Sequence, residues 1–438
     1  MLSAISSSRR LEAPPLVLAA ALPLVFLHSR YQPSVHIGTT VRASDVAVAV
    51  VVVAAAIVAR RDGVRLPATR AIWVALAALA LAVIVSTAWG ALRFAAYPTG
   101  THAITTVKWI EYMLLAPAVA VILRRPADAV PAALVAVAWA VAATGLGLLQ
   151  FFGLISNLDK LPPGSRQSSF LGYHDFSAFS AAVLVVSLLV LDSEPLTPRS
   201  RLVARAGAAA GVLGVVLGGA FDSVLGLLLA LGGLIVWRGI REPRKLAPIA
   251  VSLALVAAGT VAIRSKDVTN GLQFVGVKQD TGGSGGSTAH VQTYRQRTLL
   301  AYIGGRIFLS HPALGVGWQG SEDEYAYGPF LADARHRFNQ PAEAFPSPAH
   351  QWGVQNAFIQ ALADMGAAGL VVFLAALLVP VAAVRRRMHL LAVAGGLVML
   401  VSVGVWNGYG LIAGIPLDAL TWAAVGMTAA ALRWPGEA

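Results

Sequence analysis

Residues 71–92 read AIWVALAALALAVIVSTAWGAL, an apolar stretch without a charged side chain. A helix needs about 20 such residues to cross the roughly 30 Å hydrocarbon core of a bilayer. In water, a helix with apolar side chains on every face would have to be buried completely. The stretch therefore predicts a membrane-spanning helix, with which the rest of the chain can be compared.

The composition agrees with a chain that lies mostly in lipid. The protein has 438 residues, of which 57% are hydrophobic and 12% charged, whereas soluble domains carry about 25% charged residues. Its mean hydropathy is +0.70. It contains no cysteine, which excludes disulfides, thiolate metal sites and a thiol nucleophile. We expect an all-α polytopic membrane protein.

Apolar runs recur along the whole chain, and we expect about twelve transmembrane helices. The runs lie near residues 13–29, 45–59, 71–92, 104–123, 129–153, 169–191, 203–220, 223–237, 246–263, 356–384, 390–406 and 411–432. The seventh and eighth meet at Gly218-Gly219-Ala220-Phe221-Asp222. Because a single helix over both runs would overshoot the bilayer, the sequence predicts a tight helical hairpin there.

The distribution of Lys and Arg predicts the orientation of these helices. If the N-terminus is cytoplasmic, 19 Lys and Arg residues fall at cytoplasmic ends and 6 fall in the short loops on the other side. Short cytoplasmic loops of membrane proteins carry this excess. We therefore expect both termini in the cytoplasm. The net charge of +12 follows from the same pattern, so it does not indicate nucleic-acid binding.

A long polar loop divides the chain into three regions. Residues 1–263 form a membrane region of nine spans, and residues 355–438 form one of three spans. Residues 264–354 form a large extracytoplasmic loop between spans 9 and 10. The segment 266–292 is a Gly/Ser-rich linker. The segment 293–310 has apolar residues at helical spacing, which predicts an amphipathic helix in the membrane interface.

Three stretches of the chain carry a family resemblance. The first runs from Arg297 along the amphipathic helix to His311-Pro312-Ala-Leu-Gly315-Val-Gly317. The second is Gln355-Asn356-Ala-Phe-Ile-Gln360-Ala-Leu-Ala-Asp364-Met-Gly366, and the third is Arg166-Gln-Ser-Ser-Phe170 with His174-Asp175. Together with the arrangement of the spans, these stretches resemble the O-antigen ligase and O-antigen polymerase family of membrane glycosyltransferases.

The resemblance implies a reaction and its partners. Members of this family move a glycan from an undecaprenyl-diphosphate carrier to a hydroxyl acceptor, such as a glycan or a glycolipid. The implied fold is the twelve-span bundle with its outside loop, in the inner (cytoplasmic) membrane of a bacterium. Neither a cofactor nor a metal ion is implied. The sequence does not separate the ligase activity from the polymerase activity.

Arginine is the residue type that the leaving group of this reaction requires. A diphosphate departs as the glycosidic bond breaks, so cations must neutralise its charge. The planar guanidinium holds two phosphate oxygens and keeps its own charge. Arg297, Arg166 and Arg264 are the outside arginines nearest to expected membrane boundaries. We expect Arg297 in catalysis and Arg166 and Arg264 in donor binding; pairing with lipid head groups is the alternative role of all three.

The acceptor hydroxyl must also lose a proton, and histidine is a common base. The family usually has His-Asn at the start of the helix after the loop, whereas this chain has Gln355-Asn356, with His350 as the nearest histidine. We expect His350 and Gln355 at the catalytic position, with Asn356 and His311 binding substrate. Asp222 at the hairpin tip is a second possible base or acceptor-binding group, unless it only caps its helix.

A metal-dependent enzyme and a transporter are both less compatible with the sequence. Glu322, Asp323 and Glu324 form an acidic run, but consecutive carboxylates do not converge on one metal ion, so we expect a solvated loop. A transporter or flippase for a lipid-linked or polar substrate would show internal repeats and broken spans at matching places, and no repeat is evident. A catalytically inactive relative that binds glycan stays open, because the usual His-Asn pair is missing.

Overall fold

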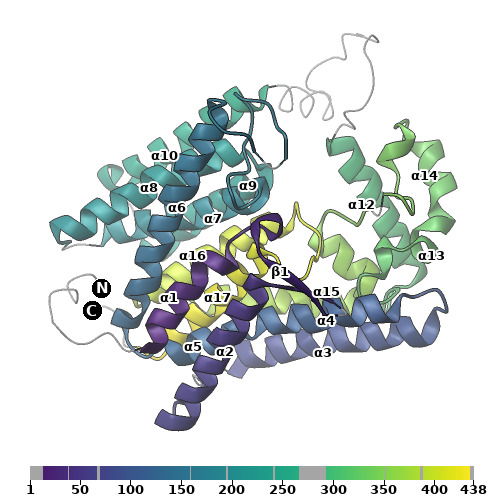
Figure 1. The fold of residues 1–438 in the computed structure, drawn as a ribbon, viewed down its shortest axis with the longest axis horizontal. Coiled ribbons are helices and arrows are strands. Elements are labelled where there is room, and N and C mark those ends of the chain that lie inside the picture. Colours follow the sequence, from purple (N-terminus) through teal and green to yellow (C-terminus); the bar gives the residue numbers. More distant parts are fainter. Residues whose placement is uncertain are drawn as a thin grey trace.

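The computed structural model describes residues 13–37, 39–66, 70–157, 159–193, 196–239, 242–265, 293–350, 352–384 and 388–434. Most of these residues are helical (Figure 1). The helices before the long loop are α1 (Ala13–Val25), α2 (Ala43–Asp62), α3 (Arg70–Arg93), α4 (Thr99–Met113), α5 (Leu115–Ile122), α6 (Val130–Phe151), α7 (Tyr173–Asp192), α8 (Pro198–Gly218), α9 (Phe221–Arg238) and α10 (Pro243–Ile263). The later helices are α12 (Thr293–Ser310), α13 (Glu324–Tyr327), α14 (Leu331–Arg337), α15 (Ala357–Ala383), α16 (Leu390–Trp406) and α17 (Pro416–Ala431).

Helix length and composition confirm an all-α polytopic membrane protein. Within the described ranges, nine helices are long and apolar enough to cross a bilayer: α2, α3, the unit of α4 and α5, α6 to α10, and α15. The other three expected runs are also helical, but α1, α16 and α17 have only 13, 17 and 16 residues. One small element was not expected, since β1 (Ser34–Ile37) and β2 (Thr39–Arg42) pair as an antiparallel hairpin after α1.

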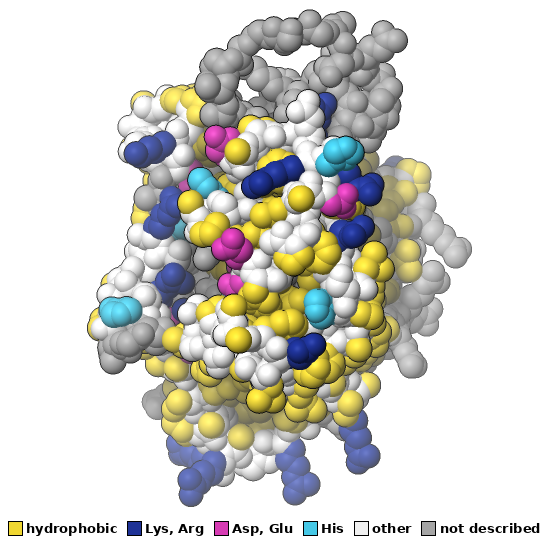
Figure 2. Space-filling model, turned by 90° about the vertical axis from the view of Figure 1, so that its right-hand side faces the viewer, with side chains coloured by type: hydrophobic (Ala, Val, Ile, Leu, Met, Phe, Trp, Pro, Cys, Tyr) yellow, Lys and Arg dark blue, Asp and Glu magenta, His cyan; other side chains and the backbone are white. Residues whose placement is uncertain are grey.

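The distribution of hydrophobic and charged side chains on the surface is that of a membrane protein. Lys and Arg side chains project from the lower end of the molecule in Figure 2, and a largely hydrophobic zone lies above them. Basic, acidic and histidine side chains are mixed over the upper part of this face. On the membrane helices, Val74 is 65% exposed and Leu81 60% exposed. Such side chains are stable only where lipid covers them.

Helices α7 and α8 pack closely against each other. A Cβ added at Gly211 would lie 2.7 Å from the Leu184 side chain, and one at Gly218 would lie 2.9 Å from that of Ser177. Gly214 is equally close to Ser180. Small residues allow membrane helices to approach in this way. Of the candidate spans, α7 has the largest buried share, 78%, so its first turn is held in a fixed position.

Helix α15 is broken where the loop meets the membrane region. Gly366 has φ +70° and ψ −170°, which is not helical. The turn at residues 312–317 fills the break: the N–H of Ala367 donates to Pro312 O at 2.9 Å, and Gly317 N–H donates to Asp364 O at 3.0 Å. Val316 N–H donates to Ala363 O at 3.0 Å. The turn that directly follows α12 is therefore also the contact that joins this part of the loop to α15.

The amphipathic helix expected at residues 293–310 is α12, and its apolar face is covered by protein. Leu299, Leu300, Ile303 and Ile307 are at most 2% exposed. They form a small core with aromatic residues of the same loop, among them Tyr327 and Phe345. The described part of the loop from residue 293 onward therefore packs around a small hydrophobic core, to which Ala363 of α15 also belongs.

The acidic run in this loop is not solvated as expected. Asp323 pairs with His102 of α4, with 2.7 Å between Oδ2 and Nε2. The Glu322 carboxylate lies against Gly353, where a Cβ would overlap it. Only Glu324 is exposed. The reason is tertiary, since the docking of the loop on α4 and α15 turns two of the three carboxylates inward.

We expect the glycines at the α15 break to be essential for stability. Alanine at Gly366 or Gly315 would be strained at positive φ, about 1 to 2 kcal/mol in each case, and its Cβ would overlap the backbone of Ala313 or Asp364. Gly366→Ala and Gly315→Ala should therefore lower the melting temperature in detergent. Gly305→Ala on α12 is the control, because nothing lies within 4 Å of its added Cβ. Equal melting of all three variants and the wild type would contradict this account of the break.

Glu322 should make stability depend on pH. Burial raises its pKa to about 8, and the carboxylates of Asp364 and Asp323 contribute to the rise. An unfolded Glu titrates near 4.5, so between these values the folded state holds a proton that the unfolded state has released. Stability therefore falls as pH rises through this window. Thermal unfolding across it should show a smaller fall for Glu322→Gln than for the wild type. The exposed Glu324→Gln should retain the wild-type slope, and identical slopes for all three would rule out this assignment.

Candidate active site at the tip of the α8–α9 hairpin

The predicted hairpin places a carboxylate at the tip between α8 and α9. Gly219 ends α8 with φ +58°, and α9 begins at Phe221. Asp222 lies in the first turn of α9 and is 5% exposed. Its Oδ1 accepts from the N–H of Ser223 at 2.7 Å. The cap position belongs to Ala220, so Asp222 is not the N-cap, and its second oxygen serves another contact.

That second oxygen faces a histidine of the neighbouring helix. His174, in the first turn of α7, places Nδ1 2.9 Å from Oδ2 of Asp222. The side chain of His174 is 16% exposed, against 2% for Asp222, so the histidine is the reachable member of the pair. Its ring centroid lies 4.4 Å from that of Tyr173 and 5.0 Å from that of Tyr409. The pair is therefore held between two aromatic rings.

The connection between α16 and α17 packs against the His174–Asp222 pair. Gly408 lies so close to Asp222 that a Cβ would overlap the carboxylate. Burial raises the pKa of the adjacent Tyr409, and the neighbouring carboxylates of Asp175 and Asp222 raise it further. The phenol of Tyr409 therefore keeps its proton at neutral pH and acts as a hydrogen-bond donor.

Two arginines flank the hairpin tip. Arg264 donates from Nη1 to Gly219 O at 2.6 Å, and its guanidinium carbon lies 4.5 Å from the centroid of the Phe221 ring. Arg166 places its guanidinium 4.1 Å from the centroid of the Tyr173 ring. A Cβ on Gly219 would lie 3.1 Å from Cδ of Arg264 and 3.4 Å from Cβ of Arg166. Both cations therefore stand beside the same turn.

A third arginine, in the loop, lies within electrostatic range of the tip. The charge of Arg297, in the second turn of α12, acts favourably on the Asp222 carboxylate. Its Nε is buried, and none of the described residues accepts a hydrogen bond from it. Helix α12 is positioned here because Gly304 packs on Val354 and Ile359 at the start of α15. Arg166 and Arg264 thus contact the hairpin turn and its neighbours, and Arg297 lies within electrostatic range of Asp222.

Asn356 is linked to the same tip through the α16–α17 connection. Its Oδ1 accepts from the N–H groups of Phe358 and Ile359 at 3.1 and 3.0 Å, which caps α15. Its Nδ2 donates to the backbone and side-chain oxygens of Asn407, both at 2.9 Å. Asn407 directly precedes Gly408, which packs on Asp222.

The other predicted site residues have different surroundings. His350 is exposed, its N–H donates to Ser347 O at 3.0 Å, and its ring stacks on Trp352 at 6.2 Å. The ring of His311, at the end of α12, lies edge-on to Phe94 at 5.5 Å. Gln355 is partly exposed, one residue before the cap of α15. The structure thus brings Arg166, Arg264, Arg297 and Asp222 together, with Asn356 one contact away.

His174, Tyr409 and Asn407 were not among the predicted site residues. A functional role for His174 was indicated by its position, because it follows the Arg166 motif and directly precedes Asp175. Its pairing with Asp222 depends on how α7 packs on the hairpin. Tyr409 and Asn407 gave only the short polar sequence Asn-Gly-Tyr-Gly between two apolar runs, which reads as an ordinary turn.

Neither a metal-binding cluster nor similarity to a known protein indicates the function of this site. Among the described residues, no group of three His, Asp or Glu side chains could hold a metal ion. Comparison with protein-family models and with curated proteins gives no match. The arrangement must therefore be interpreted from the chemistry of its own residues.

We expect the His174–Asp222 contact to be a measurable energetic coupling. In a double-mutant cycle of His174→Gln and Asp222→Asn, the double variant should lose about 1 to 3 kcal/mol less than the sum of the single losses. Unfolding in mixed micelles measures these values. The control cycle is Arg30→Gln with Asp159→Asn, an exposed pair 3.5 Å apart, where coupling should stay below about 1 kcal/mol. Additive losses at His174 and Asp222 would show that the two groups do not interact.

Proposed function

We propose that this protein transfers a glycan from an undecaprenyl-diphosphate carrier to a hydroxyl acceptor, as O-antigen ligases and polymerases do. The observation that carries the proposal is the convergence of Arg166, Arg264 and Arg297 at the His174–Asp222 pair. A lipid diphosphate needs clustered cations, and an acceptor hydroxyl needs a base. This site offers both at one hairpin tip.

The arginines would bind the donor and stabilise its leaving group. As the acceptor oxygen bonds to the anomeric carbon, the bond from that carbon to the diphosphate oxygen breaks, and undecaprenyl diphosphate leaves with the electron pair. Guanidinium groups neutralise the charge that develops on it. Arg264 is largely fixed by its bond to Gly219, whereas Arg297 has a buried Nε without a partner in the described part of the chain. Arg297 is therefore the group most available to the diphosphate.

His174 is the proton acceptor that the geometry favours. Oδ2 of Asp222 lies 2.9 Å from Nδ1 of His174. With the ring proton on Nδ1, Nε2 would keep its lone pair, as in other catalytic histidines that stand beside a carboxylate. Nε2 would take the proton of the acceptor hydroxyl as the new glycosidic bond forms. Tyr409, whose ring lies beside His174, and Asn356, which bonds Asn407, would orient the acceptor. On this proposal, His350, Gln355 and His311 have secondary roles.

The topology in this proposal is the twelve-span arrangement in a bacterial cytoplasmic membrane, with both termini in the cytoplasm. Three contacts support termini on one side of the membrane. Leu18 of α1 and Leu123 after α5 share a small core with Ala430 of α17, and Trp434 Nε1 donates to Arg124 O at 3.1 Å. The loop of residues 264–354 and the arginine site would then face the opposite side, where lipid-linked glycans are used.

A transporter is the second candidate, and the break in α15 is the observation in its favour. Broken helices in transporters line the substrate path with free backbone groups. Here the turn at residues 312–317 occupies the break and bonds its backbone groups. Transport would also leave the clustered arginines and the His174–Asp222 pair without a specific purpose, so we favour the transferase.

Arg297 provides the direct test. In cells whose only copy is Arg297→Ala or Arg297→Lys, glycan attachment should fall about 100-fold or more, the usual effect of removing one group that stabilises transition-state charge. Undecaprenyl-linked glycan should accumulate. Arg306→Ala is the control on the same helix, because Arg306 faces Asp333 at 3.8 Å. Normal attachment in both Arg297 variants would refute the role, and unchanged glycan with lost uptake of a polar substrate would favour the transporter.

A comparison of two histidines tests the base. His174→Gln should lower the transfer rate by about 10²- to 10⁴-fold, the usual contribution of a general base, and should remove the acidic limb of the pH–rate profile. His350→Gln should retain both the rate and the profile. The opposite result would assign the base to His350 and leave His174 as a structural residue.

A further inference from the structure

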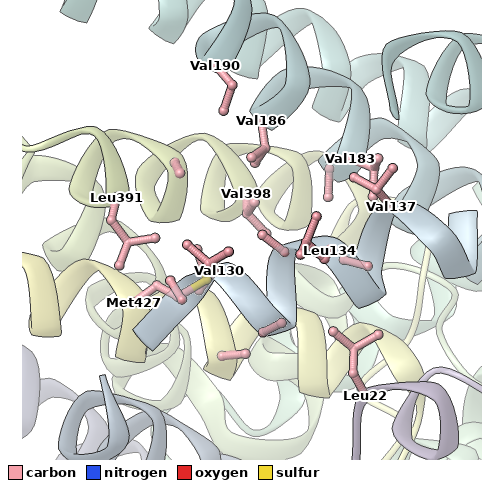
Figure 3. Close-up of a pocket in the computed structure, with 18 of the residues that line it drawn as sticks. Leu22, Val130, Leu134, Val137, Val183, Val186, Val190, Leu391, Val398 and Met427 are labelled. Carbon is pink, nitrogen blue, oxygen red and sulfur yellow. The ribbon is translucent and has the colours of Figure 1, made fainter. Parts of the chain in front are cut away.

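A large apolar cavity lies within the membrane-spanning part of the chain, apart from the arginine site (Figure 3). Its volume is about 500 Å³. Helix α6 lies on one side of the cavity, and residues of α1, α2, α5, α7, α8, α16 and α17 also line it. In Figure 3, side chains from several of these helices point into one space, including Leu134, Val186, Leu391 and Met427.

Small side chains create this space. Ala133 and Ala136 of α6, Ala182 of α7 and Ala423 of α17 all line the cavity. Because an alanine side chain ends at Cβ, the helices leave a hollow between their backbones. Next to the cavity, α7 packs closely on α8, where glycines of α8 contact Ser177, Ser180 and Leu184.

An empty cavity of this size would be very unfavourable. Protein interiors have few voids larger than a water molecule, and the cost of a cavity grows with its volume. Water does not fill a space lined by Leu, Val and Ala, because it would lose its hydrogen bonds. The surrounding medium is lipid, so hydrocarbon is the available filling.

The two ends of the cavity differ, and this difference points to one ligand. Phe26 and Phe179 line the end nearest to the hairpin tip, with their ring centroids 4.8 Å apart. Ser193, Thr197 and Ser200 line the other end, at the connection of α7 and α8. From Phe179 to Ser193 the cavity extends about 21 Å along α7, at 1.5 Å per residue. It is thus a long apolar slot with hydroxyl groups at one end.

Two basic residues neighbour the polar end of the cavity along α8. Arg199 and Arg201 stand in the first turns of α8, and both are exposed. They flank Ser200, which lines the cavity. Guanidinium groups beside hydroxyl groups suit a phosphate, and the apolar slot behind them suits a hydrocarbon chain. Both features meet in a membrane phospholipid.

We infer that this cavity binds one acyl chain of an anionic phospholipid, whose phosphate lies at Arg199 and Arg201. The lipid belongs to the leaflet on the side where α8 begins. The acyl chain of this lipid would pack against the cavity-lining face of α7, and His174 lies at the other end of this helix. The inference does not depend on the proposed glycan transfer.

Photo-crosslinking in lipid nanodiscs tests it. The full-length protein is placed in nanodiscs with phosphatidylglycerol that carries a diazirine on one acyl chain, and labelled peptides are mapped by mass spectrometry. Label should concentrate on the cavity lining of α6, α7 and α17. Phosphatidylcholine with the same diazirine should label the lining about tenfold less, which corresponds to about 1.4 kcal/mol of preference. Equal labelling by both lipids would refute the anionic ligand.

Matched variants separate the cavity from the general lipid surface. Ala182→Phe, or the smaller Ala423→Leu, fills the cavity and should lower the lining label about tenfold. Ala56→Phe adds the same volume on an exposed face of α2 and should leave it unchanged. Arg199→Ala with Arg201→Ala should abolish the preference for phosphatidylglycerol, whereas Arg60→Ala with Arg61→Ala should not. Unchanged label in folded Ala182→Phe and Ala423→Leu, or displacement of the label by undecaprenyl phosphate alone, would overturn the assignment.

Discussion

The backbone hydrogen bonds between the turn at residues 312–317 and the break in α15 are the contact on which the arrangement of this protein depends. A break in a membrane helix leaves N–H and C=O groups that lipid cannot satisfy. Here the N–H of Ala367 and the carbonyl of Asp364 find partners in the turn. The described part of the loop is therefore attached at a fixed place, α12 packs on the start of α15, and Arg297 lies within electrostatic range of Asp222 in the α8–α9 hairpin.

The balance of charge at that hairpin follows from the same attachment. Before the loop is considered, Arg166 and Arg264 already stand beside Gly219. With Arg297 added, three cations lie near two carboxylates, that of Asp222, which is paired with His174, and that of the neighbouring Asp175. The excess positive charge is partly buried, where water screens it weakly. A site of this kind is unfavourable when empty of anions, and a diphosphate would relieve it.

Helix α7 connects the two sites that we propose. His174 lies in its first turn and Ser193 at its far end, beside the cavity. One face of α7 packs on the glycines of α8, and another lines the cavity. The position of His174 therefore depends on close packing along one side of this helix and on whatever fills the space along the other.

The sequence alone determined the membrane class, the helical runs, the hairpin at residues 218–222 and the candidate arginines, because hydrophobicity, charge and turn preference are local properties of the chain. Only the tertiary structure decided that His174 pairs with Asp222, that Asn407 bonds Asn356, and that Glu322 and Asp323 turn inward. It also decided that the apolar face of α12 is covered by protein. Each of these results depends on which helices approach one another. Which helices approach one another is determined by the packing of small residues between distant segments, and a local sequence pattern does not show this.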